Sequence, residues 1–121
     1  MSGENKGVEV KIEKDRVFIV VKERVLNALS VPALRDTVVK LAENPQVLGK
    51  DIILDLSNVE ICDSRGISAI MSVRRLASTI NKGMAIVTQN ETLIKLFDIV
   101  KITHLIPIFR NINEVDFQKK P

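Results

Sequence analysis

The chain has 121 residues, of which 45% are hydrophobic and 27% charged, so it fits one globular domain that is long enough to bury a core. Its net charge of +3 comes from 18 basic and 15 acidic residues scattered along the sequence, which does not favour direct binding to nucleic acid. Aromatic residues make up only 3%, so stacking on single-stranded bases is also disfavoured.

Signals for membranes and secretion are not found in the sequence. No apolar run approaches the ~18 residues that a membrane-spanning helix needs. Residues 1–7 lack the apolar segment of a signal peptide. The single cysteine, Cys62, excludes an internal disulfide and fits a reducing compartment. We therefore expect a cytoplasmic protein without membrane insertion, with a flexible N-terminus at residues 1–7 and one domain at residues 8–118.

The chain begins with a predicted hairpin. Apolar and polar residues alternate over residues 8–12, and a more continuous apolar run covers residues 17–21. These patterns indicate a half-buried strand paired with a more deeply buried one. Residues 22–29 are ambiguous and are expected to be mostly loop.

A helix and a buried strand are predicted next. Ser30 is a suitable N-cap, and Pro32 fits the first turn because its missing N–H is not needed there. The helix should end before Pro45, which restricts the residue that precedes it. Residues 52–56 then form a short, almost continuous apolar run, typical of a strand buried on both faces.

Helices and strands alternate in the second half of the chain. A helical pattern begins at Ser64 and ends near Gly83, which we expect in the left-handed conformation. Residues 84–87 predict a fourth strand, and Asn90 is the predicted N-cap of a third helix.

The last elements complete the prediction of the fold. Residues 105–109 predict a fifth strand, which Pro107 places at a sheet edge. Asn111 and Glu114 resemble the capping box of a short final helix. We therefore predict an α/β fold, a single domain with a mixed, mostly parallel sheet of about five strands and helices packed against it.

One stretch of the sequence points to a site. Ile-Ile-Leu-Asp-Leu-Ser at residues 52–57 is followed by Asp-Ser-Arg-Gly at residues 63–66. A buried strand thus leads to a helix whose first turn carries Asp63 and Ser64, at the end of an α/β sheet where binding sites lie. This pattern resembles STAS domains, in particular the bacterial anti-sigma factor antagonists, and the resemblance extends over about residues 8–115.

The resemblance implies a partner switch controlled by phosphorylation, and not an enzyme. The unphosphorylated protein would bind an anti-sigma factor that is itself a serine kinase, freeing a sigma factor for transcription. The kinase, using its own ATP and Mg²⁺, would phosphorylate the serine that matches Ser64, and a separate serine phosphatase would reset the switch. We expect no cofactor in the chain itself and a monomer or weak dimer. The partner-binding residues would be Asp63, Ser64, Arg65, Gly66 and Ile67.

Two positions depart from the family pattern. The residue after the serine is usually small, but here it is Arg65. This guanidinium would pair with the phosphate, contact the partner, or be an ordinary exposed charge. The position two after the motif glycine is often glycine, but here it is Ser68, which affects the packing of the first helical turn.

Residue types alone leave structural roles open at the same positions. Ser64 and Asp63 both suit a helix N-cap. A phosphate on Ser64 would also be compatible with the positive end of the helix dipole. Gly66 would let the backbone turn and a partner approach closely. Asp55, inside the apolar strand, is either a supporting site residue or, as we favour, a structural hydrogen-bond acceptor.

Other chemistry is weakly supported. Cys62 is better explained as a small buried hydrophobe than as a nucleophile. One cysteine and one histidine, His104, cannot make a usual zinc site, so we expect no metal. The rival within the fold is a STAS subunit of a signalling scaffold or transporter complex that is never phosphorylated. A small serine hydrolase using Ser64 is unlikely, because no Gly-x-Ser-x-Gly elbow is present.

Overall fold

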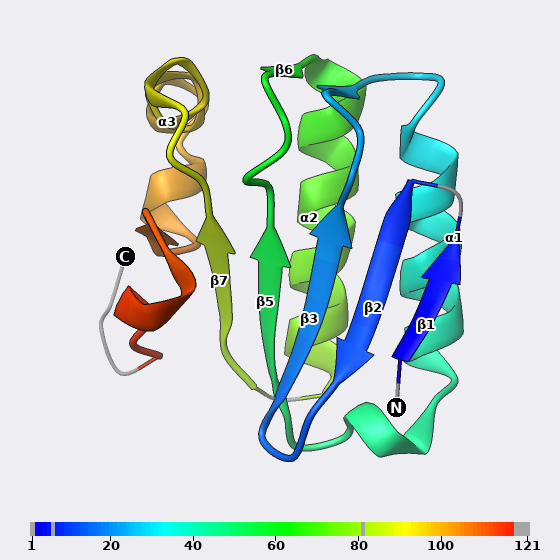
Figure 1. The fold of residues 1–121 in the computed structure, drawn as a ribbon. Coiled ribbons are helices and arrows are strands. Elements are labelled where there is room, and N and C mark those ends of the chain that lie inside the picture. The colour runs from blue at the N-terminus through cyan, green and yellow to red at the C-terminus, as the bar shows by residue number, and fades with distance from the viewer. Residues whose placement is uncertain (1, 6, 81, 118–121) are drawn as a thin grey trace.

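A mixed β-sheet forms the centre of the fold (Figure 1). The computed structural model describes residues 2–5, 7–80 and 82–117. In this part of the chain the sheet has six strands in the order β1-β2-β3-β5-β7-β8. The first three strands pair antiparallel, and β3, β5, β7 and β8 pair parallel. The strands are β1 (Ser2–Asn5), β2 (Val8–Ile12), β3 (Arg16–Val21), β5 (Asp51–Asp55), β7 (Met84–Val87) and β8 (Ile108–Phe109).

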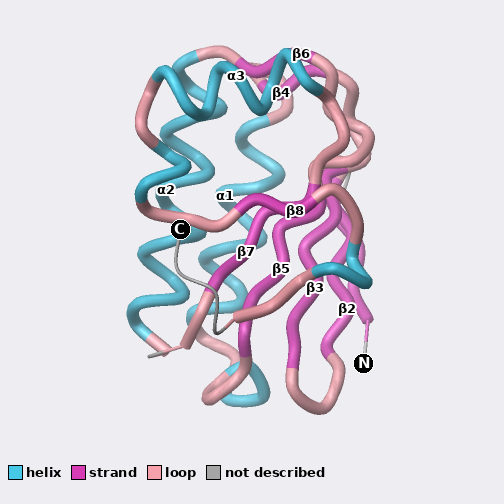
Figure 2. The backbone as a smooth tube through the Cα atoms, turned by 90° about the vertical axis from the view of Figure 1, so that its left-hand side faces the viewer, coloured by secondary structure: helices cyan, strands magenta, loops and turns pink. Residues whose placement is uncertain are grey.

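Helices connect the parallel strands. The described helices are α1 (Val31–Ala42), α2 (Ser64–Thr79) and α3 (Glu91–Ile99), with short 3-10 turns η1 (Pro45–Val47), η2 (Ile102–His104) and η3 (Ile112–Glu114). α1 and α2 lie side by side on one face of the sheet, and α3 lies beyond the end of β7 (Figures 1 and 2). A separate small sheet joins β4 (Val25–Leu26) to β6 (Ile61–Cys62).

The main core lies between the sheet and the pair of helices α1 and α2. Alternate residues of β3 point into it, because successive side chains of a strand face opposite sides. Ile52 and Leu54 of β5 and Met84 and Ile86 of β7 continue this buried layer. The helices contribute buried side chains at helical spacing: Leu34, Leu41, Ala69, Ile70, Val73 and Ala77.

A smaller core covers part of the other face of the sheet. Ile53, Ala85 and Val87 are buried there beneath the C-terminal segment, which contributes Phe109 and Val115. The segment with η3 lies on the side of the sheet opposite to α1 and α2 (Figure 2). Both faces of β5 are thus buried, which is why its sequence reads as an almost continuous apolar run.

The fold class predicted from the sequence is confirmed. The five predicted strands correspond to β2, β3, β5, β7 and β8, the sheet is mixed and mostly parallel, and helices pack against it. Asn90 caps α3 as predicted, since its side chain accepts a hydrogen bond of 3.1 Å from the backbone N–H of Leu93. Pro107 directly precedes β8, the edge strand.

One N-terminal prediction needs correction, and a short strand adds detail to another. Ser2–Asn5, expected to belong to a flexible terminus, instead pair with β2 as β1. Gly7, at φ 84°, provides the positive dihedral for the turn between these strands. Residues 22–29 are mostly loop, as expected, and contain the short strand β4 at Val25–Leu26. A two-residue strand is too short to leave a periodic pattern, so its pairing with β6 could not be predicted.

The later element ends also differ. The predicted strand at residues 105–109 is reduced to Ile108–Phe109, because the chain first turns through η2. The predicted last helix is only the 3-10 turn η3. Gly83 is not left-handed, and its N–H instead donates to Asp51 Oδ1 at 3.0 Å. The end of α1 agrees with the prediction, because the helix stops at Ala42, before Pro45. Residue 118, the predicted domain end, lies outside the described residues.

Within the part of the chain that the structure describes, none of the helices has the length and apolar character needed to span a bilayer.

Candidate functional site

Two loops join above the carboxyl ends of the parallel strands. β4 and β6 pair in parallel there, with Leu26 opposite Cys62. The backbone N–H groups of Glu60 and Ile61 both donate to the Arg24 carbonyl, and the side chains of Arg24 and Glu60 form an ion pair. This small sheet lies at the top of Figure 1, next to the first turn of α2. The start of α2 is therefore held by backbone pairing on a rigid support.

Ser30 stabilises the same region in a way that the sequence did not indicate. It occupies the N-cap position of α1 but makes no side-chain cap. Its hydroxyl instead donates to the Val25 carbonyl at 2.6 Å and accepts from the Asn27 N–H at 3.0 Å. The serine thus fixes the loop between β4 and α1 that supports the site.

Asp63 is the N-cap of α2. Its Oδ1 accepts hydrogen bonds from the backbone N–H groups of Arg65 at 2.9 Å and Gly66 at 3.1 Å. Its own N–H donates to the Leu26 carbonyl at 3.2 Å. A carboxylate is well placed here because the first N–H groups of a helix have no partner within the helix. Of the two capping candidates in the sequence, the structure selects Asp63.

Ser64 is therefore not needed as the N-cap of α2. It is the first helical residue of α2 and is exposed. Its hydroxyl makes no hydrogen bond to any other described residue. A free hydroxyl on a rigid helix start can be reached by a modifying enzyme without unfolding. The helix N-terminus also tolerates added negative charge.

Gly66 is required by the packing of α2 against the small sheet. A Cβ atom at this position would lie 2.5 Å from Cys62 Sγ and 2.6 Å from the Leu26 carbonyl oxygen. Both distances are far below a normal contact, and the carbonyl belongs to the backbone of β4. The glycine was expected to let the backbone turn and a partner approach closely. The structure shows a close approach within the chain itself, and the approach of a partner stays a prediction.

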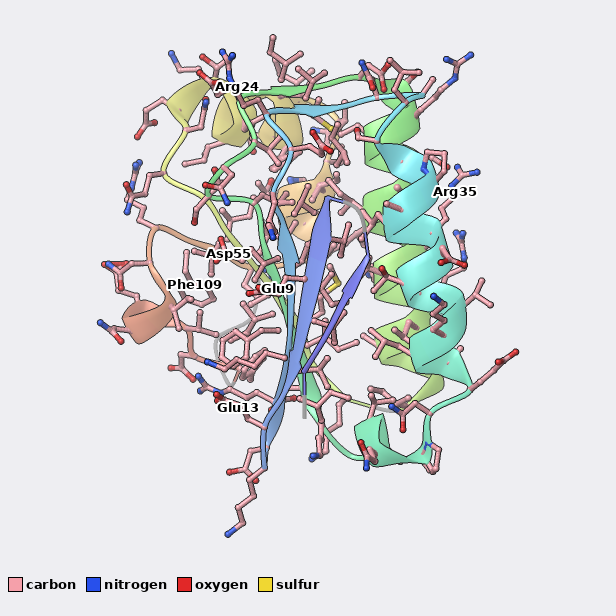
Figure 3. The ribbon with its side chains drawn as sticks, turned by 45° about the vertical axis from the view of Figure 1, so that its right-hand side comes forward. Glu9, Glu13, Arg24, Arg35, Asp55 and Phe109 are labelled. Atoms are coloured by element: carbon pink, nitrogen blue, oxygen red, sulfur yellow. The ribbon has the colours of Figure 1, made fainter. Side chains whose placement is uncertain are left out.

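Arg65 lies on an exposed groove beside the start of α2. The groove has a volume of about 630 Å³ and runs mainly along α1. Arg35, on the outer side of α1 in Figure 3, lines the same groove, and its Nη2 donates to Ser68 Oγ at 3.3 Å. Sequence reasoning missed Arg35, because only the packing of α1 on α2 brings it to the motif. The lining residues are Ala28, Val31, Pro32, Arg35, Asp36, Val39 and Arg65.

Large apolar side chains are exposed on the two joined loops. Leu29 is 91% exposed and Ile61 60% exposed. Ile67, expected to contact a partner, is half-buried, and its backbone N–H donates to the Asp63 carbonyl. Leu29, which follows β4, and Ile61 of β6 are thus exposed apolar side chains beside the start of α2.

Asp55 has a structural role in the loop after β5. Its Oδ1 accepts from the backbone N–H of Ser57 at 2.9 Å and from the Ser57 hydroxyl. It lies in register with Val20 and Val87, on the sheet face away from α1 and α2. Figure 3 places it near Phe109, on that face. The interpretation as a structural hydrogen-bond acceptor fits these contacts.

Cys62 and His104 are the other side chains that the sequence singled out as candidates for chemistry. Burial, with a contribution from the nearby Asp63 charge, raises the pKa of the Cys62 thiol to about 11, so the nucleophilic thiolate is disfavoured. His104 is exposed in η2, beyond α3. Among the described residues, no group of three His, Cys, Asp or Glu side chains is arranged to hold a metal ion.

Comparison with known proteins agrees with this architecture. The STAS domain family model matches residues 9–115, so the chain belongs to the STAS domain family. Its fold is similar to that of an anti-sigma factor antagonist from Mycobacterium paratuberculosis, with a TM-score of 0.73, 15% identity, and coverage of 88% of this chain and 87% of that one.

Two further solved structures share the fold. A candidate anti-sigma factor antagonist from Thermotoga maritima has a TM-score of 0.71 at 22% identity, covering 87% of each chain. The unphosphorylated form of the anti-sigma factor antagonist SpoIIAA has a TM-score of 0.65 at 15% identity, covering 88% of this chain and 91% of that one. No curated protein matches the sequence.

Proposed function

We propose that this protein is an anti-sigma factor antagonist that works as a switch controlled by phosphorylation of Ser64. The unphosphorylated form binds an anti-sigma factor with serine kinase activity and so releases a sigma factor for transcription. The kinase, with ATP and Mg²⁺, phosphorylates Ser64 and ends the interaction, and a serine phosphatase restores it. Membership of the STAS family and the names of the structural neighbours support this class.

One observation carries the proposal: Asp63 caps α2, which leaves the hydroxyl of Ser64 exposed and without a hydrogen-bond partner among the described residues. Asp63 satisfies the first N–H groups of α2, and Ser64 is exposed beside it with a hydroxyl that no described residue binds. A phosphate there adds about −1.5 to −2 charges. The helix dipole accepts this charge locally, so the fold is retained. The added charge acts on the partner that faces the exposed Leu29 and Ile61.

A phosphorylation assay tests the site. Each anti-sigma factor kinase of the source genome is incubated with the protein, ATP and Mg²⁺, and intact mass is measured. We expect one added phosphate on the wild type and none on Ser64→Ala. Ser57→Ala, Ser68→Ala and Ser72→Ala serve as matched controls and should be modified normally. Phosphate on one of these serines with Ser64 untouched would refute the assignment.

Two further measurements, of partner binding and of ester hydrolysis, separate the rival functions. A STAS subunit of a scaffold or transporter complex would bind its partner without any phosphate transfer. A hydrolase would show turnover of ester substrates that is lost in Ser64→Ala.

A binding titration tests the switch itself. We expect Ser64→Asp to bind the anti-sigma factor at least tenfold more weakly than the wild type, since a misplaced charge at an interface is costly. Its melting temperature should stay within a few degrees of the wild type, because Asp is well tolerated in the first turn of a helix. A collapse of the melting temperature would instead assign the effect to folding, and the switch would be rejected.

A further inference from the structure

A cation from a different helix contacts α2 one turn beyond the proposed phosphorylation position. Arg35 belongs to α1, yet its Nη2 lies 3.3 Å from Ser68 Oγ on α2. Ser68 follows Ser64 by four residues, so the two serines share one face of α2 on successive turns. A helical side chain covers the turn that precedes it. The guanidinium of Arg35 therefore contacts the face of α2 that Ser64 shares, one turn beyond Ser64.

The charges around this position favour an anion. Arg35 and Arg65 line one groove, and neither makes an ion pair with any described residue. Asp63 faces the site from α2, but its Oδ1 already accepts two backbone N–H groups. Asp36, the acid next to Arg35 on α1, is paired with Lys40 at 3.3 Å. The hydroxyl of Ser68 is thus the present partner of Arg35, and it is a neutral, weak acceptor compared with a phosphate.

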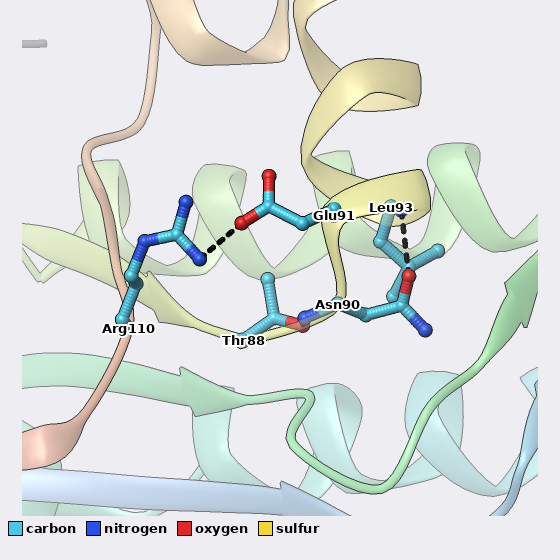
Figure 4. Close-up of polar contacts among 5 residues, drawn as sticks. All are labelled: Thr88, Asn90, Glu91, Leu93 and Arg110. Atoms are coloured by element: carbon cyan, nitrogen blue, oxygen red, sulfur yellow. Dashed lines mark hydrogen bonds and ion pairs between the residues drawn. The ribbon is translucent and has the colours of Figure 1, made fainter.

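A matching arrangement exists elsewhere in the same molecule. Glu91 is the first residue of α3, following the N-cap Asn90, as Ser64 follows the N-cap Asp63 in α2. Its carboxylate forms an ion pair with Arg110, which comes from the segment after β8 (Figure 4). An acid in the first position of a helix can therefore be held in this fold by an arginine from a neighbouring element.

We infer that Arg35 is the intramolecular receptor of the Ser64 phosphate. On phosphorylation its guanidinium exchanges the Ser68 hydroxyl for the phosphate and makes a charge-assisted pair between α1 and α2. This pairing also withdraws Arg35 from the groove that it lines in the unphosphorylated protein. The phosphorylated surface then differs from the unphosphorylated one in charge and in shape. The inference rests on the proposed function, because it requires a phosphate on Ser64.

The test installs phosphoserine at position 64 during translation, so no kinase is needed. The second pKa of the phosphate, ordinarily about 6, is measured by ³¹P NMR. In the wild type we expect the arginine to lower it, and Arg35→Gln to raise it by about 0.5–1 unit relative to the wild type. Arg35→Lys should give an intermediate value. Arg75→Gln, three turns further along α2, is the matched loss of charge and should leave the wild-type value.

Each outcome decides the inference. Equal phosphate pKa values in the wild type and Arg35→Gln, or an equal rise in Arg75→Gln, would overturn it. Ser68→Ala should keep the low value, because Ser68 is only the partner that Arg35 leaves. Failure of every kinase to modify Ser64, with the pKa shift present, would reject the proposed function and leave the phosphate receptor intact. Modification of Ser64 by a kinase without the pKa shift would support the proposed function and overturn the inference that Arg35 receives the phosphate.

Discussion

α2 and α3 both begin beyond the carboxyl ends of parallel strands. Their first turns differ in the residue that follows the N-cap and in whether that residue has an arginine partner. In each, an Asx residue caps the helix: Asp63 in α2 and Asn90 in α3. In α3 the next residue is an acid that already has its arginine, Glu91 with Arg110 (Figure 4). In α2 the next residue is Ser64, which is neutral and has no such partner within the described residues.

The two helices carry their negative charge at different positions. In α2 the charge is on the N-cap, Asp63, and the first helical residue is a neutral serine; in α3 the N-cap Asn90 is neutral and the charge is on the first helical residue, Glu91. The proposed phosphate on Ser64 would add to α2 a negative charge at the position that Glu91 occupies in α3. The packing beneath the first turn of each helix differs as well. The third helical residue is Leu93 in α3, which packs into the core, and Gly66 in α2, which lets the helix touch the backbone of β4. The proposed phosphorylation site thus lies at the helix start that packs against the pair β4 and β6.

The largest expected effect comes from filling the contact beneath α2. Gly66→Ala would place a Cβ atom 2.6 Å from the Leu26 carbonyl oxygen, so β4 or the helix start has to move. We expect a loss of about 1–3 kcal/mol in the free energy of unfolding, as for overpacking elsewhere, despite the better helix propensity of alanine. Urea denaturation measures it. Thr92→Ala, exposed in the first turn of α3, is the control and should change little.

An unchanged stability in Gly66→Ala would mean that the small sheet yields easily. The contact with β4 would then not hold the start of α2 in place, and the comparison with α3 would lose its basis.

A smaller effect should follow from removing the two caps. Asp63→Ala frees two backbone N–H groups and Asn90→Ala frees one, so we expect losses of about 1 kcal/mol, larger for Asp63→Ala. Asp63→Asn keeps an acceptor and should lose less than Asp63→Ala. Denaturation of the three variants gives the ranking. If Asn90→Ala were the more damaging, the cap of α2 would be less important than its geometry indicates.

The sequence predicted what local patterns determine. Strand and helix periods located β2, β3, β5, β7 and the helices, and residue type located the cap at Asn90. It could not choose between Asp63 and Ser64 as the cap, because both residue types serve and only the backbone path separates them. It also could not place Arg35 beside Ser68, since these residues meet only through the packing of α1 on α2.

The smallest expected effect concerns the ion pair at α3, which is exposed and therefore screened by solvent. The hydrogen bond from Arg110, and then its charge, lower the pKa of Glu91. The native state thus binds the Glu91 proton less readily than the unfolded chain. The stabilisation is present above the ordinary glutamate pKa and is lost as the pH falls through the lowered native value.

Comparison of the wild type with Glu91→Gln at different pH values measures this pair. We expect the wild type to have a slightly higher melting temperature at pH 7, with the difference shrinking as the pH falls below the ordinary glutamate pKa and shrinking in high salt. Glu43→Gln, an exposed glutamate just after α1, controls for the loss of one negative charge. A difference that depends on neither pH nor salt would show that Glu91 acts through packing and not through its charge. Glu91 and Arg110 would then no longer be a model for phosphorylated Ser64 and Arg35. A difference that follows the pH as expected would predict a stronger effect at α2, because a phosphate carries more charge than a carboxylate.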